Sequence, residues 1–373
     1  MAKFYKISVI FIAILIFLQF FNSVPMVCYA ESKVDKYESM ITIETKTGRV
    51  LYEKDKNKKL PMASTTKILT AIVAIENTED LDKKHKIPKA ATDIEGSSIY
   101  LKEKEELSIR ELLYGLMLRS GNDAAVAIAI IVAGSVENFV KLMNEYCLKL
   151  KLKDTNIVTV NGLHDDNHYT TASDLAAITV SAMKNEIFRE IVASKEMLIS
   201  NTLDAKNKCR FLKNKNKLLK MVEGANGVKT GYTKKSGKCF VGSATRNNMD
   251  IICVVLNSKT MFNECADLIN KAFNDYRYVK LLGKGELVKG KDGANVILKN
   301  DICYVLSKDE LSKIKAKLNV SNNDNFNEYG LVDIGSIDFV IENNLIFSEK
   351  IYTIKEKKLS SLKENFNKII KAF

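Results

Sequence analysis

The sequence predicts an α/β protein in which an antiparallel sheet meets a cluster of helices, followed by a small all-β domain and a C-terminal amphipathic helix. Strand-like alternation occurs at residues 40–53, and two further strand-like runs occur at 239–245 and 250–256, on the other side of several apolar helical segments. After residue 277 the composition changes to short β-like runs between Gly- and Asn-rich turns. The chain has 373 residues, of which 46% are hydrophobic, so it can bury a core and has room for two domains.

The N-terminal segment has the pattern of an export signal. Lys3 and Lys6 precede an apolar run, Ile7–Phe21, and small residues occupy the −3 and −1 positions of a cleavage site that ends at Ala30. We therefore expect residues 1–30 to be a signal peptide and the mature protein to be exported, either secreted or held at the outer face of the cytoplasmic membrane and the cell wall. A permanent N-terminal anchor is the alternative, although the run is shorter than the roughly 20 residues that span a bilayer.

The chain is basic, with 57 Lys+Arg against 45 Asp+Glu and a formal net charge of +12. In the cytosol such a charge would suggest a nucleic acid partner. For an exported protein we expect no nucleic acid, and the available polyanions are cell-wall polymers and anionic lipid head groups. Seven basic residues crowd positions 206–220. A solvated surface and a dedicated polyanion site are both open interpretations of this segment.

The cysteines predict neither a metal site nor a disulfide framework. Six of them follow the signal peptide, and none has a CxxC or another metal-ligand spacing. We expect scattered buried thiols and no bound metal. The six are Cys147, Cys209, Cys239, Cys253, Cys265 and Cys303.

The first 276 residues supply the elements of the α/β part. Residues 40–53 alternate as a hairpin, and the segment after Ser64 is apolar nearly all round, which is typical of a helix buried inside a domain. Three more helices are expected at 108–119, 123–133 and 136–150, two strands at 239–245 and 250–256, and a closing helix at 262–276.

The remainder predicts strands and one terminal helix. Short β-like runs occur at 286–289, 296–298, 302–306 and 339–341. The last stretch carries six Lys against two Glu, and its apolar residues Leu359, Leu362, Phe366, Ile369, Ile370 and Phe373 share one helical face. This helix is expected either to pack on its own domain or, as the charge favours, to make peripheral contact with the outer face of the membrane. The expected domains are 31–276, 277–354 and the helix 355–373.

A candidate nucleophile stands at the start of the buried helix, in Ser64-Thr65-Thr66-Lys67. Residues three apart share a helix face, so the lysine amine can reach the serine hydroxyl. A serine needs a base to become a nucleophile, and a lysine serves only if burial or a second cation lowers its pKa. The Ser-x-x-Lys pattern also starts at Ser181, Ser312 and Ser360, but only Ser64 precedes a uniformly apolar helix and two further motifs.

Two further motifs follow. Ser120-Gly121-Asn122 separates two helices, where a tight turn can expose both polar side chains; an ordinary helix cap is the alternative. Lys229-Thr230-Gly231 follows a Gly-rich approach, offers a cation and a hydroxyl to a carboxylate, and at Gly231 allows a substrate backbone to come close. The same letters at Lys46-Thr47-Gly48 fall at a hairpin tip and indicate a turn only.

In this order the three motifs resemble those of the penicillin-interacting serine enzymes. The Ser-Gly-Asn triplet and its surroundings resemble the D-alanyl-D-alanine carboxypeptidases over about residues 35–275. The resemblance implies a transpeptidase-like α/β fold, a peptidoglycan stem peptide ending in D-Ala-D-Ala as substrate, β-lactam antibiotics as covalent inhibitors, and no cofactor. The supporting stretches are PMASTTKILTA, LMLRSGNDAAVAIA, NGLHDDNHYTTASDLA and GVKTGYTKKSGKCFVGSA.

The resemblance also implies a role for each motif residue. Ser64 would attack the carbonyl of the penultimate D-Ala, Lys67 would take the Ser64 proton, and Ser120 would relay a proton to the leaving amine. Penicillin would acylate the same Ser64 and leave slowly.

The remaining motif residues would bind substrate. Asn122 would hold the substrate backbone or position Lys67. Lys229 and Thr230 would bind the terminal carboxylate, and Lys229 would also help to keep Lys67 neutral. Tyr232, directly after Gly231, would supply one backbone N–H of the oxyanion hole, and Ser64 would supply the other.

A histidine-containing run and the shared chemistry of this fold allow other interpretations. The run His164-Asp165-Asp166-Asn167-His168 could suggest a metal, but its turn-like composition favours a loop, with His168 fixing that loop near the site. A β-lactamase of the same fold would need a deacylating Glu, and residues 150–200 contain no convincing Glu-x-x-Leu-Asn-like run. A catalytically silent wall-binding protein is a further alternative. Endopeptidase action on cross-links, which is the same chemistry, is not separated from carboxypeptidase action.

Overall fold

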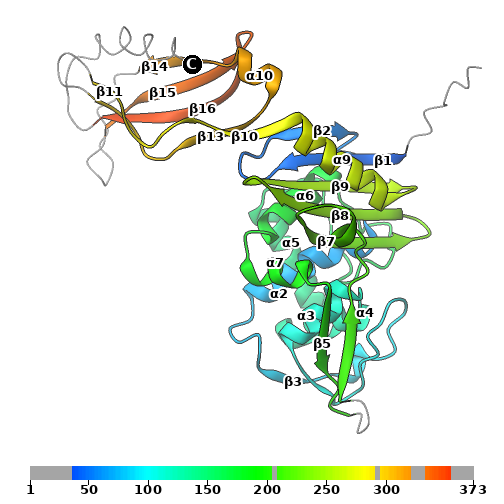
Figure 1. Cartoon of the computed structure of the whole chain (residues 1–373). Helices are drawn as coiled ribbons and strands as arrows, with labels where there is room; N and C mark the ends of the chain where they lie inside the picture. Colours follow the sequence, from blue (N-terminus) through cyan, green and yellow to red (C-terminus); the bar gives the residue numbers. More distant parts are fainter. Residues whose placement is uncertain (1–35, 204–207, 290–294, 321–331, 354–373) are drawn as a thin grey trace, which may run out of the picture. The chain divides into compact units, whose positions relative to one another are not determined.

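The computed structural model describes residues 36–203, 208–289, 295–320 and 332–353 (Figure 1). The expected signal peptide and the expected terminal helix both lie outside these residues. Within them, no single helix is long and apolar enough to cross a membrane. One pair of helices, Asn122–Ala133 and Val136–Lys149, would pass together but is bent by 86° at its break.

A five-stranded antiparallel sheet forms the centre of the α/β part, in the order β2-β1-β9-β8-β7. The two predicted hairpins supply its first four positions: β1 pairs with β2 and β8 pairs with β9 as expected, and β1 also pairs with β9, which sets Ile41 opposite Val254. The edge strand β7 carries the third motif. The strands are β1 (Tyr37–Glu44), β2 (Val50–Lys54), β7 (Ala225–Thr233), β8 (Gly237–Arg246) and β9 (Met249–Ser258).

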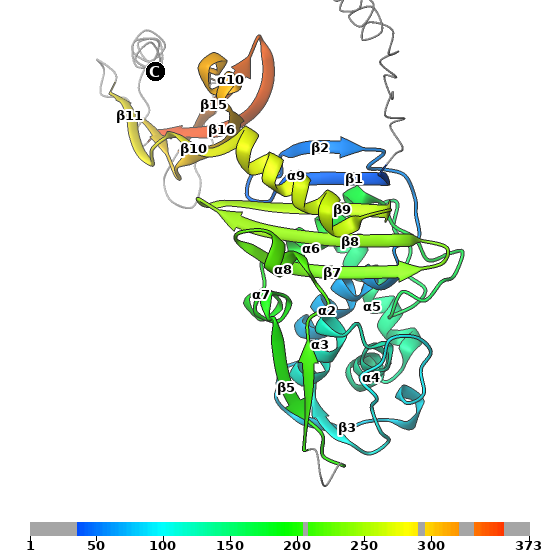
Figure 2. The same cartoon turned by 45° about the vertical axis from the view of Figure 1, so that its right-hand side comes forward.

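Both faces of this sheet are buried, and successive residues face opposite sides. On β9, Ile252 and Val254 join the core of the helical cluster, whereas Ile251 and Val255 pack with the helix α9 (Met261–Asp275). Figures 1 and 2 show α9 along one face of the sheet and α2, α5 and α6 on the other. The run of buried residues along β8 and β9 is therefore explained by two cores, one on each side.

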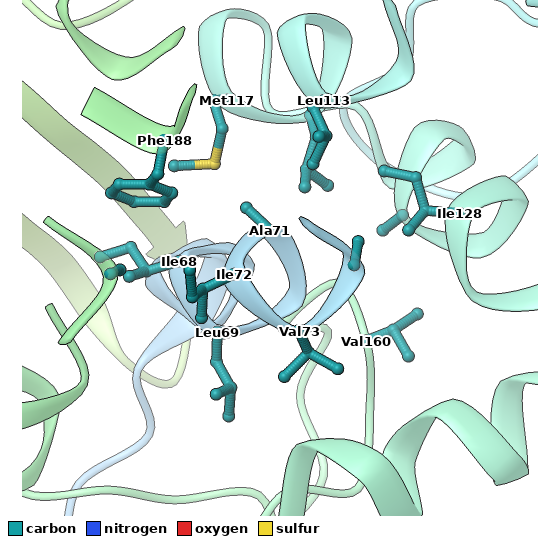
Figure 3. Close-up of a cluster of buried hydrophobic side chains, with 14 of the residues drawn as sticks. Ile68, Leu69, Ala71, Ile72, Val73, Leu113, Met117, Ile128, Val160 and Phe188 are labelled. Atoms are coloured by element: carbon teal, nitrogen blue, oxygen red, sulfur yellow. The ribbon is translucent and has the colours of Figure 1, made fainter. Parts of the chain in front are cut away.

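The helical cluster surrounds α2, which is the predicted buried helix. Nine of the ten α2 residues are buried, because neighbouring helices enclose it on all sides. In Figure 3, Ile68 and Ile72 of α2 lie near Phe188 of α7, while Leu113 of α3 and Ile128 of α4 pack over its far end. The helices are α2 (Lys67–Glu76), α3 (Ile109–Leu118), α4 (Asn122–Ala133), α5 (Val136–Lys149), α6 (Ala172–Ala182) and α7 (Glu186–Ala193).

Burying an aliphatic side chain of this size contributes about 1.5–3 kcal/mol, so α2 is held as a rigid element. The short 3-10 helix η1 (Ala63–Thr66) leads directly into it. A residue in η1 is consequently fixed by the core of the domain rather than by a free loop.

Several short elements were not among the expected ones. They are the strand pairs β3 (Lys84–Lys86) with β4 (Glu106–Ser108) and β5 (Glu196–Ser200) with β6 (Cys209–Lys213), the short helix α8 (Leu218–Met221), the turn η2 (Lys89–Ala91), and the helices α6 and α7.

From residue 276 onward the chain is built mainly of strands, as the sequence predicted. Buried residues between Leu282 and Ile351 form a third core, whereas Val305 packs in the core beside α9. One difference is the helix α10 (Lys308–Lys313), which begins with a capping box in which Ser307 and Glu310 satisfy each other's backbone N–H. The strands are β10 (Tyr276–Leu282), β11 (Gly285–Lys289), β12 (Asn295–Leu298), β13 (Ile302–Ser307), β14 (Lys315–Val320), β15 (Val332–Ile341) and β16 (Asn344–Thr353); β10 pairs with β13, and the others form the sheet β11-β12-β16-β15-β14.

Candidate active site

Ser64 and Lys67 meet at the junction of η1 and α2. Lys67 Nζ lies 2.9 Å from Ser64 Oγ, 2.7 Å from Asn122 Oδ1 and 2.5 Å from the backbone carbonyl oxygen of Asn161. Ser64 is half-buried, whereas Lys67 is fully buried. The structure therefore brings together residues from the first two sequence motifs, through the lysine amine.

The surroundings of Lys67 disfavour its ammonium form. Burial is the main cause that holds the pKa of Lys67 well below its usual range, and the nearby charge of Lys229 lowers it further. A neutral amine has two N–H groups and one lone pair. Because the oxygens of Asn122 and Asn161 can only accept, the two N–H groups point to them and the lone pair is left facing the Ser64 hydroxyl. This is the arrangement that a general base requires.

Asn122 and Ser120 are placed by the sharp turn between α3 and α4. The Asn122 side chain donates through Nδ2 to the Glu95 carbonyl at 2.6 Å, which fixes Oδ1 toward Lys67. Ser120 is buried and has a positive φ of 64°, a strained value for a residue with a side chain. Gly121 is the N-cap of α4 and makes no side-chain cap bond. The helix-cap alternative therefore does not describe this motif.

Asn161 and Gly162 were not singled out by sequence. The Asn161 carbonyl accepts from Lys67, and the adjacent Val160 carbonyl accepts from Thr70 of α2 at 2.7 Å. Gly162 has a φ of +81°, and a Cβ there would lie 2.0 Å from the Ala63 carbonyl oxygen. The available signal was an Asn-Gly pair inside one of the stretches that carried the family resemblance.

The third motif lies on β7, whose outer edge pairs with no other strand among the described residues. Lys229 is buried, and its Nζ donates to the Thr230 carbonyl at 2.9 Å. A Cβ on Gly231 would lie 3.0 Å from Ser64 N, so the close approach seen here is between β7 and the backbone of η1. Approach of a substrate backbone at Gly231 stays a prediction. Tyr232, the next residue, is exposed.

Lys229 belongs to a group of cations that includes a residue not anticipated from the sequence, Lys215. Burial lowers the pKa of Lys229 to about 7, and the charge of Lys215 is the second cause. Lys215 also contributes to the lowered pKa of Lys67, and its Nζ donates to Ser97 Oγ at 3.3 Å. The positive charges repel one another, which disfavours the ammonium form of each lysine unless an anion binds nearby.

The two histidines of residues 164–168 point to different partners. His168 is buried; its Nδ1 accepts from the Val158 N–H at 3.0 Å, which leaves Nε2–H to donate to Thr66 Oγ1 at 2.8 Å. Burial lowers the pKa of His168 to about 4, so it is neutral at pH 7. His164 Nε2 instead lies 3.3 Å from Asp166 Oδ1. His168 therefore ties the 156–168 loop to η1, in agreement with the loop-fixing interpretation.

The chain is similar to known proteins both in sequence and in fold. A family model described as D-alanyl-D-alanine carboxypeptidase, peptidase S11, matches residues 29–260. The D-alanyl-D-alanine carboxypeptidase DacF of Bacillus subtilis is 32% identical over 301 residues, which are 77% of each chain. Two solved structures are similar: penicillin binding protein 5 from Haemophilus influenzae (TM-score 0.74, 26% identity, 86% of this chain and 97% of that one) and the Streptomyces K15 DD-transpeptidase (TM-score 0.61, 32% identity, 64% and 97%). The chain therefore belongs to peptidase family S11, the serine-type D-alanyl-D-alanine carboxypeptidases.

Proposed function

We propose that Ser64 is the nucleophile with which this carboxypeptidase releases the terminal D-alanine of a peptidoglycan stem. The observation that carries the assignment is the position of Lys67 Nζ, within hydrogen-bond distance of Ser64 Oγ and of the carbonyl oxygens of Asn122 and Asn161. In the neutral amine the two N–H groups bond these carbonyl oxygens, and the lone pair faces Ser64 Oγ. Lys67 takes the Ser64 proton as Oγ attacks the carbonyl of the penultimate D-Ala. The C–N bond then breaks, the proton held by Lys67 is relayed through Ser120 to the leaving amine, and an ester on Ser64 remains for water to hydrolyse.

Substrate binding follows from the edge strand. An extended peptide can add to the unpaired edge of β7 through backbone hydrogen bonds. Its terminal carboxylate then meets Lys229 and the Thr230 hydroxyl, and Asn122 holds the peptide backbone or Lys67. The N–H groups of Ser64 and Tyr232 stabilise the oxyanion, which the proximity of Gly231 to Ser64 N supports. A β-lactam enters the same site, acylates Ser64 and leaves slowly.

The first experiment is D-Ala release from a diacyl-Lys-D-Ala-D-Ala peptide together with intact-mass detection of a penicillin adduct. We expect both in the wild type and neither in Ser64→Ala, which loses only one half-buried oxygen and should stay folded. Rapid penicillin turnover with little D-Ala release would indicate the β-lactamase alternative. Folded wild-type protein with no adduct and no release would indicate a silent binding protein and would refute the mechanism.

The pH profile is expected to report two lysines. Acylation needs neutral Lys67, so kcat/KM falls on the acid side as Lys67 gains a proton. Carboxylate binding needs cationic Lys229, whose pKa of about 7 in the free enzyme makes kcat/KM fall as pH rises above about 7. The measurement is kcat/KM between pH 5 and 10 for wild type and Lys229→Arg. The arginine stays charged, so its alkaline limb should disappear; a wild-type profile that is flat from pH 6 to 9 would contradict this assignment.

We infer that the enzyme works outside the cytoplasm, because its substrate lies there and residues 1–30 have an export pattern. The basic, amphipathic residues 355–373 support peripheral membrane contact. Liposome sedimentation with anionic vesicles should show the full chain in the pellet and a chain ending at residue 354 in the supernatant. Equal partitioning of the two proteins would remove membrane contact from the proposal.

A further inference from the structure

A basic groove lies beside the active site, where the β5–β6 hairpin meets the approach to α8. It encloses about 610 Å³. One acidic residue, Glu196, contributes to its lining, against six basic ones: Arg119, Lys195, Lys213, Lys215, Lys217 and Lys220. We call these six residues and the space they enclose the basic groove. It accounts for most of the basic segment at 206–220 that the sequence had left open.

The local sequence explains why the charges point into one space. Residues 213–217 alternate Lys and Asn, and the asparagines hold the backbone. Asn214 Nδ2 donates to the Ser194 carbonyl at 2.9 Å, and Asn214 Oδ1 accepts from the Asn216 N–H at 2.9 Å. Asn216 Oδ1 in turn accepts from the Leu218 N–H at 2.9 Å. Because the asparagine side chains are engaged inward, the three exposed lysines between and beside them are gathered on the groove side.

The positive charge of the groove is not balanced by ion pairs within the described residues. Within the part of the chain that the structure describes, none of its six cations forms an ion pair with a carboxylate. Arg119 reaches only the Lys213 carbonyl, at 3.3 Å, and Lys217 lies over the Phe262 ring. Six positive charges that line one groove repel one another, and an anion bound there would relieve that repulsion.

The shape and composition of the groove select among anions. Five of the six cations are lysines, which act as flexible point charges and can follow closely spaced charges along a chain, whereas arginine favours oriented, bidentate contact with a single carboxylate or phosphate. A concave site fits a chain rather than the flat surface of a bilayer. Its lining contains no aromatic side chain on which a nucleic acid base could stack.

We propose that the basic groove binds an anionic chain polymer with closely spaced phosphate groups, outside the catalytic site and next to it. This goes beyond the proposed D-Ala release and does not depend on it. Such binding would hold the enzyme on the anionic material that surrounds its substrate. Lys215 joins the two regions, because it lines the groove and also repels the Lys229 amine. A phosphate at Lys215 would offset that repulsion, strengthen the Lys229 cation and lower KM.

The test uses the full chain and inorganic polyphosphate as the probe, with affinity measured at several salt concentrations. The groove variant is Lys213→Gln/Lys217→Gln/Lys220→Gln. A matched control, Lys308→Gln/Lys315→Gln/Lys317→Gln, removes the same charge from exposed lysines of α10 and β14. Thermal melting and penicillin adduct formation show that both variants are folded. We expect the groove variant to lose at least tenfold in affinity and to show a shallower salt dependence, by about two in the log–log slope, while the control stays within threefold of wild type.

Four results would overturn the proposal. The wild type could fail to bind polyphosphate at physiological salt. Both triple variants could lose affinity equally, which would show a diffuse field rather than a groove. Polyglutamate of the same length could bind as tightly as polyphosphate, which would mean that carboxylate chains are the ligand class. Anionic vesicles could bind the wild type and release the groove variant while polyphosphate does not bind, which would make the site a lipid surface. A fall in KM on adding polyphosphate to the wild type, absent in the groove variant, would support the link through Lys215.

Discussion

Replacing Lys67 by methionine is expected to lower kcat/KM for D-Ala release by about 10⁴-fold, near the upper range for the loss of a general base. Methionine keeps a similar length and apolar stem in a fully buried position, so the change removes mainly the amine. The oxygens of Asn122 and Asn161 lose their donor, which should cost about 1–3 kcal/mol of stability each unless water replaces it. The rate of penicillin acylation should fall in parallel, because the same proton transfer is needed.

The Lys67→Arg variant tests whether position 67 has to supply a base or only a positive charge. A guanidinium stays protonated at every working pH and has no lone pair to offer. If Lys67 acts as the base, Lys67→Arg is as inactive as Lys67→Met, and raising the pH restores neither variant. An arginine variant with more than a tenth of wild-type acylation would show that charge at this position is enough, and the base would have to be sought elsewhere.

Gly162→Ala is expected to have the second largest effect, on both stability and rate. The new Cβ would lie 2.0 Å from the Ala63 carbonyl oxygen and 2.9 Å from Ser64 N, and both are backbone atoms that cannot swing away. The φ of +81° adds strain of about 1–2 kcal/mol for any L side chain. We expect the free energy of unfolding to fall by about 3 kcal/mol or more. Any relief moves Ser64 or the Asn161 carbonyl, so acylation should slow by about 10²-fold.

Gly48→Ala is the matched control. Gly48 also has a positive φ, +69°, but nothing lies within 4 Å of its Cβ position. It should show the conformational cost alone, with normal acylation. Urea unfolding and the rate of penicillin acylation measure the two effects in both variants. Equal losses at Gly48 and Gly162 would show that the backbone strain, rather than the contact with η1, decides the outcome.

The strongly periodic elements could be predicted from the sequence, and the connections between them could not. Apolar helical patterns located α2 to α5 and α9, alternation located the hairpin of β1 and β2, and short continuous apolar runs located β8 and β9, because burial leaves a direct trace in the residue pattern. In the β5–β6 hairpin, Leu198 lies opposite Phe211 on an exposed face. Apolar residues therefore occupy the solvent side as well as the buried side, and the sequence shows no alternation that would indicate a strand. The capping box of α10 was visible as Ser307 and Glu310, but its helix is too short to show periodicity.

The residues of the site also differ in whether the sequence alone could predict them. Ser64, Lys67 and Asn122 could be found because side-chain chemistry at fixed spacing is written in the residue types. The Asn161 carbonyl contributes through its backbone, and every residue has a carbonyl, so no residue type marks it. Lys215 looked like one of several surface lysines, since only the fold shows that it stands next to Lys229. Gly231 was expected to make room for a substrate, and the structure adds that it lies against the backbone of η1.

The pairing of β1 with β9 has a consequence for the order of folding. Ile41 and Val254 are neighbours in the sheet although most of the α/β part separates them in the chain. Closing so long a loop is entropically costly, and contacts of this kind form late. While the chain emerges from a ribosome or a translocation pore, β1 can pair with β2, but its other edge stays open until β9 arrives. Ser64, the proposed nucleophile, is therefore expected to become competent only after nearly the whole domain has been synthesised, and a prematurely ended chain would expose an open, aggregation-prone strand edge instead of a partly active enzyme.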